Sequence, residues 1–109
     1  MADTVAGFFE ELAAKVDPAK IGGMNATYQF DITGDNGGTW HVKIADGKAE
    51  VASGPAENPN ITLTATDENW LQIITGKLSG QTAFLTGKLK IKGDMSLAMK
   101  LQSVFALGS

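Results

Sequence analysis

The chain has 109 residues, with no cysteine and 43% hydrophobic residues. This size fits one globular domain over residues 1–109, large enough to bury a core without disulfide or metal staples. The lack of cysteine excludes disulfides, thiolate nucleophiles, thiolate zinc sites and iron–sulfur ligation, and it is compatible with a reducing cytosol. No apolar run approaches the roughly 18 residues that a membrane span requires, and residues 1–16 lack the basic start of a signal peptide.

The formal net charge of −3 is unevenly distributed along the chain. Residues 1–76 carry four lysines and eleven acidic residues, a balance of −7, whereas residues 77–109 carry five lysines and one acidic residue, Asp94, a balance of +4. The chain has no arginine. Because arginine is the usual side chain for bidentate recognition of guanine and phosphate, this composition disfavours specific nucleic-acid binding.

Patterning in the first half predicts a helix followed by three strands. Apolar residues recur at helical spacing over residues 4–16, and Asp17-Pro18 ends this helix because a residue before proline disfavours helical geometry. Apolar and polar residues then alternate, with Gly-rich and Asp-Gly turn signals between the runs. The predicted strands are residues 27–32, 39–44 and 49–53, and the predicted turns are residues 34–38 and 46–47.

The second half begins with a connection, because residues 54–60 hold two prolines and two asparagines and so favour neither a helix nor a central strand. The elements predicted after this crossover are a strand at 61–66, a helix capped by Thr66 or Asp67 and ended by Gly76, a helical turn at 81–85, a strand at 88–92, and a helix capped by Asp94 and running to about Leu107. Thr-Gly-Lys-Leu occurs at 75–78 and again at 86–89. We interpret each copy as a helix end.

The residue types that carry catalysis are scarce. His41 is the only histidine, which removes two-histidine metal sites, and its predicted register points it away from the core. The Gly34–Gly38 stretch lacks the Lys-Ser/Thr ending of a phosphate-binding loop and is interpreted as a hairpin turn. We therefore expect no catalytic residues, no metal site, no cofactor and no enzyme activity.

Large apolar residues alternate with small or flexible ones at positions predicted to face inward. The small and flexible set comprises Ala49, Ala65, Met95, Ala98 and Met99. Such mixing favours an ordinary interdigitated core, while methionine also suits a wall that adapts to different guests. Both interpretations stay open on the pattern alone.

Two polar features also have alternative interpretations. Gln102 falls on the apolar side of the terminal helix by the 3.6-residue period, where it needs a backbone partner or a ligand head group. Lys88, Lys90 and Lys92 alternate along the last predicted strand. They either protect a sheet edge from pairing or form a landing surface for anionic lipid or a phosphorylated ligand.

The run from Gly87 to Gln102, with Lys20-Ile21-Gly22-Gly23 and Gly38-Thr39-Trp40 in the first half, closely resembles the sterol carrier protein 2 (SCP2) family. The resemblance covers about residues 5–105. It implies an α+β fold, SCP2-like, in which a twisted five-stranded sheet is covered on one face by helices and encloses a hydrophobic tunnel. It also implies a carrier that binds fatty acids, fatty acyl-CoA or sterols and moves them between membranes or to enzymes.

Carried over position by position, the resemblance implies a set of ligand-contacting residues, with two glutamines as polar contacts. The set is Phe30, Trp40, Val42, Trp70, Ile74, Gln81, Phe84, Ile91, Met95, Ala98, Met99, Gln102 and Phe105. The expected partners are a lipid ligand and, transiently, an anionic membrane surface, with the oligomeric state left open. The end Leu107-Gly108-Ser109 is not the small-basic-Leu signal of the family's peroxisomal forms, so we expect a cytoplasmic protein. The alternative function is a non-catalytic accessory module that uses the fold structurally.

Overall fold

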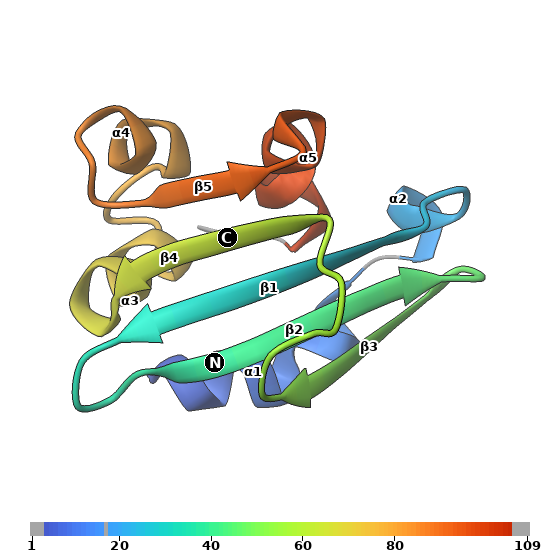
Figure 1. The fold of residues 1–109 in the computed structure, drawn as a ribbon, viewed down its shortest axis with the longest axis horizontal. Coiled ribbons are helices and arrows are strands. Elements are labelled where there is room, and N and C mark those ends of the chain that lie inside the picture. Colours follow the sequence, from blue (N-terminus) through green and yellow to red (C-terminus); the bar gives the residue numbers. More distant parts are fainter. Residues whose placement is uncertain (1–3, 17, 106–109) are drawn as a thin grey trace.

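The structure is a computed structural model that describes residues 4–16 and 18–105, with the side chains of residues 101–103 left undescribed. Its framework is a mixed five-stranded sheet in the order β3-β2-β1-β4-β5 (Figure 1). The strands are β1 (Ala26–Thr33), β2 (Gly38–Ala45), β3 (Lys48–Ser53), β4 (Ile61–Thr66) and β5 (Lys90–Gly93). Only β1 and β4 pair in parallel, which requires the predicted crossover at residues 54–60.

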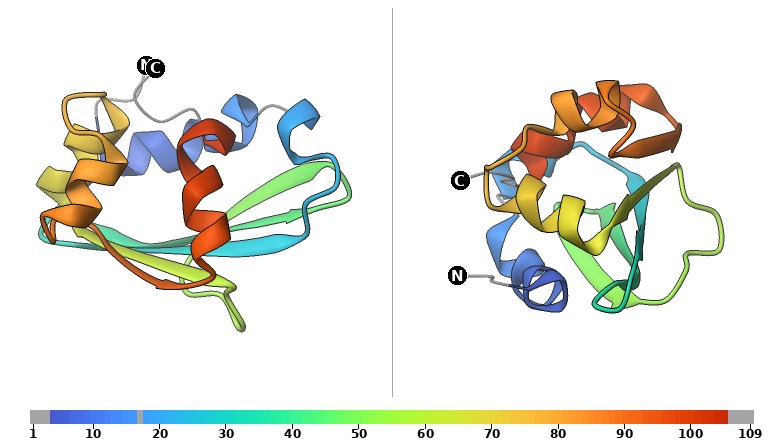
Figure 2. Two further views of the ribbon diagram at one scale, coloured as in Figure 1. Left: turned by 90° about the horizontal axis from the view of Figure 1, so that it is seen from above. Right: turned by 90° about the vertical axis from the view of Figure 1, so that its left-hand side faces the viewer.

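The helices of the described chain lie on one face of this sheet (Figure 2). They are α1 (Val5–Lys15), α2 (Pro18–Ile21), α3 (Asp67–Ile74), α4 (Gly80–Leu85) and α5 (Met95–Val104). One sheet face covered by helices and the element order together confirm the predicted α+β architecture. The apolar side of each strand therefore faces the helix layer.

The helix ends follow the predicted capping chemistry. The Thr66 hydroxyl accepts a hydrogen bond from Asn69 N at 3.1 Å at the start of α3, and the Asp94 carboxylate accepts one from Ser96 N at 2.9 Å at the start of α5. Each acceptor satisfies a backbone amide that has no intrahelical partner. The predicted continuation of the last helix to Leu107 lies outside the described residues.

The two Thr-Gly-Lys-Leu copies form the same helix ending. In the first, Lys77 N and Leu78 N donate to Gln72 O at 2.9 and 3.1 Å; in the second, Lys88 N and Leu89 N donate to Ala83 O at 2.8 and 3.0 Å. These bonds satisfy carbonyls that a helix leaves without partners at its C-terminus. The interpretation of both copies as helix ends is confirmed.

Two elements differ from the sequence prediction. Helix α2 was not expected after Asp17-Pro18, yet it begins at Pro18, because the fixed φ of proline suits the first position of a helix. Strand β5 begins at Lys90 rather than at residue 88, because the backbone amides of Lys88 and Leu89 belong to the end of α4. The sheet edge is therefore short.

Candidate functional site

An aromatic cluster lies between the sheet and the helices. The Phe9 ring of α1 stacks on Trp40 of β2 with 4.4 Å between centroids and lies 5.2 Å from Phe30 of β1. Trp70 of α3 lies 5.4 Å from Phe30. The strand register places Phe30 opposite Trp40 on one side and Leu63 of β4 on the other. The cluster therefore joins two helices to the centre of the sheet.

Tyr28 connects the same sheet face to α5. Its hydroxyl donates a hydrogen bond to Leu97 O at 2.9 Å, and its ring meets Phe105 edge-on at 4.8 Å. Burial, with a smaller contribution from the Asp94 carboxylate, raises the pKa of Tyr28 to about 12. The tyrosine is thus a neutral group whose hydroxyl donor is paired, and it fixes the last helix to the sheet.

Unlike the Tyr28 hydroxyl, the indole N–H of Trp70 lacks a hydrogen-bond partner in the described part of the chain. Its side chain is fully buried, but its indole Nε1–H finds no hydrogen-bond acceptor among the described residues. A buried donor without an acceptor costs on the order of 1 to 3 kcal/mol. Such a group is unusual in a native interior and requires an explanation.

The residues predicted to contact a ligand fall into three groups by burial. Those buried in the core are Phe30, Val42, Trp70, Ile74 and Phe105. Those half-buried against it are Trp40, Ile91 and Ala98. Those at the surface are Gln81, Phe84, Met95 and Met99. The Gln102 side chain lies outside the described residues, so its predicted partner stays a prediction.

The inward orientation expected for the two methionines is wrong. Capping by Asp94 sets the phase of α5 so that Leu97 turns toward the sheet and is buried. Met95 and Met99, four residues apart, share a different face of the helix that is exposed. Phe84 of α4 is likewise exposed, because its neighbour Ala83 takes the inward position. Whether these side chains contact a ligand stays a prediction.

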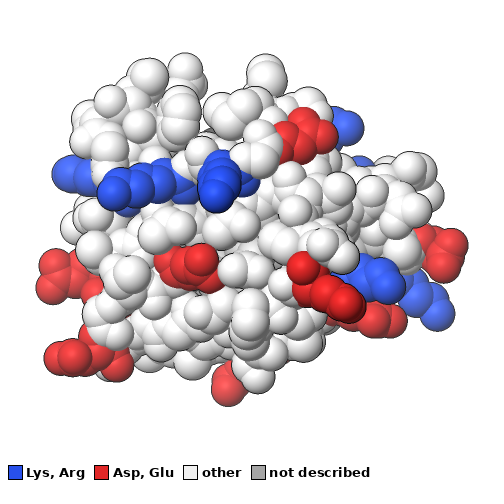
Figure 3. Space-filling view, viewed as in Figure 1, with Lys and Arg blue, Asp and Glu red and all other residues white. Residues whose placement is uncertain are grey.

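The predicted lysines lie in an exposed row along β5. Lys90 and Lys92 pair across the sheet with Thr64 and Thr62 and so share the face opposite to the helices, while Lys88 precedes the strand. Figure 3 shows the row below two mostly white lobes, which correspond to α4 and α5 in Figure 1, and acidic atoms lie on the right-hand side of the α5 lobe. The nearby Asp94 carboxylate is engaged by the hydroxyl and amide of Ser96, which lower its pKa.

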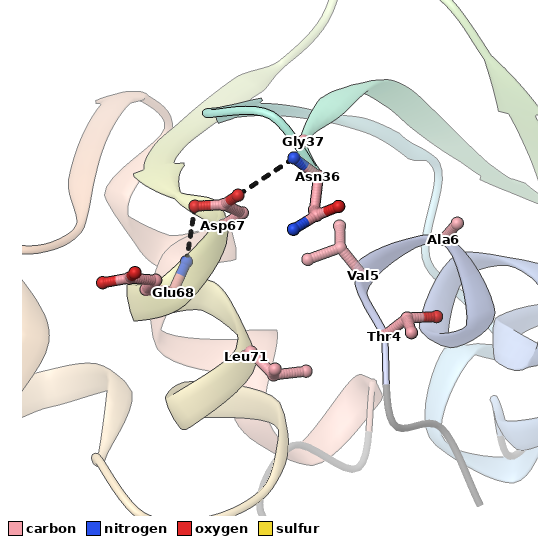
Figure 4. A pocket seen from close by; sticks show the side chains of 8 residues that line it. All are labelled: Thr4, Val5, Ala6, Asn36, Gly37, Asp67, Glu68 and Leu71. Atoms are coloured by element: carbon pink, nitrogen blue, oxygen red, sulfur yellow. Dashed lines mark hydrogen bonds between the residues drawn. The ribbon is translucent and has the colours of Figure 1, made fainter.

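A pocket that sequence reasoning missed opens at the corner between α1, the β1–β2 turn and α3. Its volume is about 600 Å³, and Figure 4 shows Val5 and Leu71 pointing toward one another across it. The Asp67 carboxylate closes one side, accepting hydrogen bonds from Asn36 N at 3.0 Å and Glu68 N at 2.8 Å. None of the predicted ligand contacts lines it. No motif indicates this pocket, because residues from three separate segments form it.

Across residues 4–16 and 18–105, the structure shows no cluster of three metal-ligating side chains. His41 lies on the sheet face away from the helices, half-buried, with Nδ1 2.9 Å from Gly54 O at the start of the crossover. That contact gives the only histidine of the chain a structural role. No helix in the described part of the chain is long and apolar enough to cross a membrane.

Comparison with known sequences decides the family. The sequence profile of the SCP-2 sterol transfer family matches residues 9–106. The chain belongs to the SCP-2 sterol transfer family. Among curated relatives, sterol carrier protein 2 of Bos taurus is 39% identical over 102 residues, covering 88% of this chain and 19% of that protein. Hydroxysteroid dehydrogenase-like protein 2 of Xenopus tropicalis is 33% identical over 97 residues, covering 88% of this chain and 23% of that protein.

Solved structures of the family have the same fold. The solution structure of a palmitated sterol carrier protein 2-like protein from Aedes aegypti is 28% identical, with a TM-score of 0.77 and 94% of both chains covered. The 109-residue chain therefore matches that SCP-2 domain almost end to end, whereas it spans only about a fifth of the length of the two curated relatives.

Proposed function

We propose that the chain is a lipid-binding sterol carrier domain that holds one apolar ligand, a fatty acid, fatty acyl-CoA or sterol, between its sheet and helices. In this proposal it works in the cytoplasm and delivers the ligand to membranes or enzymes without chemical change. Family membership over residues 9–106 is the observation that carries the proposal. Burial of an acyl chain contributes about 0.8 kcal/mol per CH₂, so a medium chain binds usefully after association costs.

The unpaired indole of Trp70 supports the placement of the ligand. A fatty acid carboxylate or a sterol hydroxyl supplies the acceptor that Nε1–H lacks, while its apolar part packs on neighbouring rings such as Phe30 and Phe9. Binding would then replace an unsatisfied donor by a hydrogen bond, which favours the bound state. In this proposal Trp70 orients the polar end of the ligand.

Tryptophan fluorescence tests the carrier function, because Trp40 and Trp70 both belong to the aromatic cluster. The detergent-free protein is titrated with palmitate, palmitoyl-CoA and cholesterol. Saturable fluorescence changes with one ligand per chain are expected. If none of the three ligands changes the fluorescence or the melting temperature, the carrier proposal is rejected.

Trp70→Phe tests the role of the indole. Loss of an N–H without a partner does not destabilise the ligand-free protein, but the smaller ring leaves a cavity at this fully buried position, so the unfolding free energy is expected to fall by about 1 to 3 kcal/mol. Palmitate affinity is expected to fall about fivefold to tenfold. Trp40→Phe is the control, since Trp40 is only half-buried. An equal loss of palmitate affinity in both variants would show that ring packing, not the hydrogen bond, is responsible.

The lysine row offers a second contact for ligands that carry phosphates. In this part of the proposal Lys88, Lys90 and Lys92 attract the nucleotide of an acyl-CoA. The triple Lys→Glu variant then binds palmitoyl-CoA more weakly but palmitate unchanged. If the triple variant bound palmitoyl-CoA and palmitate each as tightly as the wild type does, a head-group site would be excluded.

An accessory module is the second candidate function. It is favoured by the hydroxysteroid dehydrogenase-like relative, in which the matching region is only 23% of the protein. In that case the domain uses its surface to hold a neighbouring subunit or domain and binds no lipid. A folded, cooperatively melting protein that fails all three titrations would support the module.

A further inference from the structure

The two edges of the sheet differ in how they are protected against pairing with another strand. Natural edge strands are commonly short, carry lysine or proline, or are interrupted by a bulge. Strand β5 has four residues, and two of them are the exposed Lys90 and Lys92. Strand β3 (Lys48–Ser53) has six residues, contains no proline and pairs with β2 along its whole length without a bulge. In Figure 1 no further strand lies beyond β3, and α1 lies behind the sheet.

Alternate residues of β3 direct their backbone groups away from the sheet. Gly54 N donates to Thr39 O at 2.7 Å, directly after the last residue of β3. Because hydrogen-bonded pairs alternate along an antiparallel ladder, every second residue before Gly54 also bonds to β2. The residues between them are Ala49, Val51 and Ser53, and their N–H and C=O groups point outward. No described residue hydrogen-bonds to these outward groups, which we call the β3 edge.

We propose that the β3 edge pairs with the same edge of a second copy of this chain, so that two copies form one continuous antiparallel sheet about a two-fold axis. Val51 then lies opposite Val51 of the second copy, and Ala49 lies opposite its Ser53. Each pair exchanges two N–H···O bonds, so every outward group of the edge has a partner. Residues directly opposite one another share a face of the sheet, and both helix layers therefore lie on the same side. The interface goes beyond the carrier function and does not depend on lipid binding.

The side chains of β3 favour this register over its neighbour. Glu50 and Ala52 are exposed on the sheet face away from the helices, and Lys43 of β2 lies opposite Glu50 within each copy. In the proposed register, Glu50 faces Ala52 of the second copy. A shift of the pairing by two residues would place Glu50 opposite Glu50, and like charges directly opposite one another destabilise a sheet. On the helix side, the proposed register brings the half-buried Val51 side chains of both copies together and covers apolar surface.

A strand from another protein suits the β3 edge less well. Strand addition gains its specificity from pockets that take alternate side chains of the added strand, whereas β3 presents the small side chains of Ala49, Ala52 and Ser53. The edge is instead complementary to itself, because its outward groups meet one another in antiparallel order. A second copy is therefore the partner that uses all of them.

The full chain without added ligand tests the proposal. A two-strand interface is small, and small interfaces dissociate readily, so sedimentation equilibrium is expected to show monomers at about 10 µM and mostly dimers at about 1 mM. A chain that stays monomeric at about 1 mM would overturn the proposal.

Amide hydrogen exchange at both concentrations locates the interface. The amides of Ala49, Val51 and Ser53 are expected to exchange freely in the dilute protein and about tenfold more slowly in the concentrated protein. The amides of Glu50 and Ala52 bond within each copy and are expected to be protected at both concentrations. A dimer that leaves the three outward amides unprotected would overturn the proposal. Protection of these amides already in the dilute monomer would also overturn it, because another segment of the same chain would then cover the edge.

Charge substitutions at the exposed Ala52 test the register. Because position 52 faces Glu50 twice across the axis, Ala52→Lys is expected to tighten dimerisation about fivefold and Ala52→Glu to weaken it about fivefold. In the shifted register position 52 faces Lys48, so effects of the opposite sign would overturn the proposed pairing. The matched controls, Thr33→Lys and Thr33→Glu, change the same charge at an exposed position of β1 and are expected to leave dimerisation within about twofold. Equal effects at the two positions would show a response to net charge alone and would contradict the pairing.

Discussion

The inner face of β1 and the outer face of α5 contain similar apolar residues in opposite environments. Phe30 is fully enclosed between neighbouring strands and two helices, whereas Met99 is almost fully exposed on α5. In the first region the apolar residues hold the layers together. In the second they are available to a partner. Side-chain type therefore does not distinguish the two regions, whereas the cover supplied by neighbouring elements does.

Replacing Phe30 and Met99 by alanine is expected to give the largest contrast in unfolding free energy. Phe30→Ala removes a ring that contacts Phe9, Trp70 and Phe105, so the unfolding free energy is expected to fall by about 3 to 5 kcal/mol. Met99→Ala is expected to change it by less than about 0.5 kcal/mol, as for other surface positions. Urea unfolding measures both. A loss above about 2 kcal/mol in Met99→Ala would mean that this methionine is packed in the native protein.

Two glycines with positive φ give a second contrast in stability. Gly34 lies in the turn beside the pocket, and Gly87 lies at the end of α4. A Cβ at Gly34 (φ +103°) would lie 2.6 Å from Asp67 Cγ, whereas a Cβ at Gly87 (φ +79°) meets nothing within 4 Å. Gly34→Ala is expected to cost about 2 to 4 kcal/mol through backbone strain and displacement of Asp67, and Gly87→Ala about 1 kcal/mol. Thermal unfolding compares them, and equal losses would contradict the role of Asp67 in fixing the turn.

Ala98 lies between the two regions, half-buried on α5 and packed against the core. Ala98→Phe is expected to lower palmitate affinity at least tenfold, while the ligand-free protein loses less than the roughly 1 to 3 kcal/mol that overpacking costs in a filled core. Fluorescence titration and urea unfolding of the same sample measure the two effects. Strong destabilisation without ligand would place Ala98 in ordinary core.

Tyr28 links the inner face to α5 and makes that link sensitive to pH. Its pKa is raised by burial to about 12 in the folded protein, above the value of about 10 for an unfolded tyrosine. The unfolded chain therefore releases this proton first, so stability is full below pH 10 and falls as the pH rises toward 12. Denaturation midpoints across this range are compared with those of Tyr28→Phe, which is expected to lack this component. An identical pH profile in the variant would contradict the assignment.

The sequence predicted the fold through local signals that the structure uses. Alternation in the strands, the caps at Thr66 and Asp94 and the two Thr-Gly-Lys-Leu endings all depend on nearby residues, and all are confirmed. The start of β5 was misplaced by two residues, because the preceding helix ending retains the amides of Lys88 and Leu89. Local chemistry sets element type, while neighbouring elements set the boundaries.

The candidate site was less predictable because it depends on contacts between distant segments. Met95 and Met99 point outward because of the rotation of α5 about its own axis. The apolar pattern of this short helix does not determine that rotation. The corner pocket joins α1, a turn and α3, and the missing acceptor of Trp70 is a property of its surroundings. No residue pattern in the sequence carries that information. Burial and hydrogen-bond partners are set by the tertiary arrangement of these segments.

Native mass spectrometry of protein purified without detergent tests the central claim most directly. The carrier account predicts a population with one lipid-sized mass added per chain, and a delipidated sample that takes up one palmitate with saturation at a single molecule. Observation of the bare chain alone, before and after addition of palmitate, palmitoyl-CoA and cholesterol, would contradict the account.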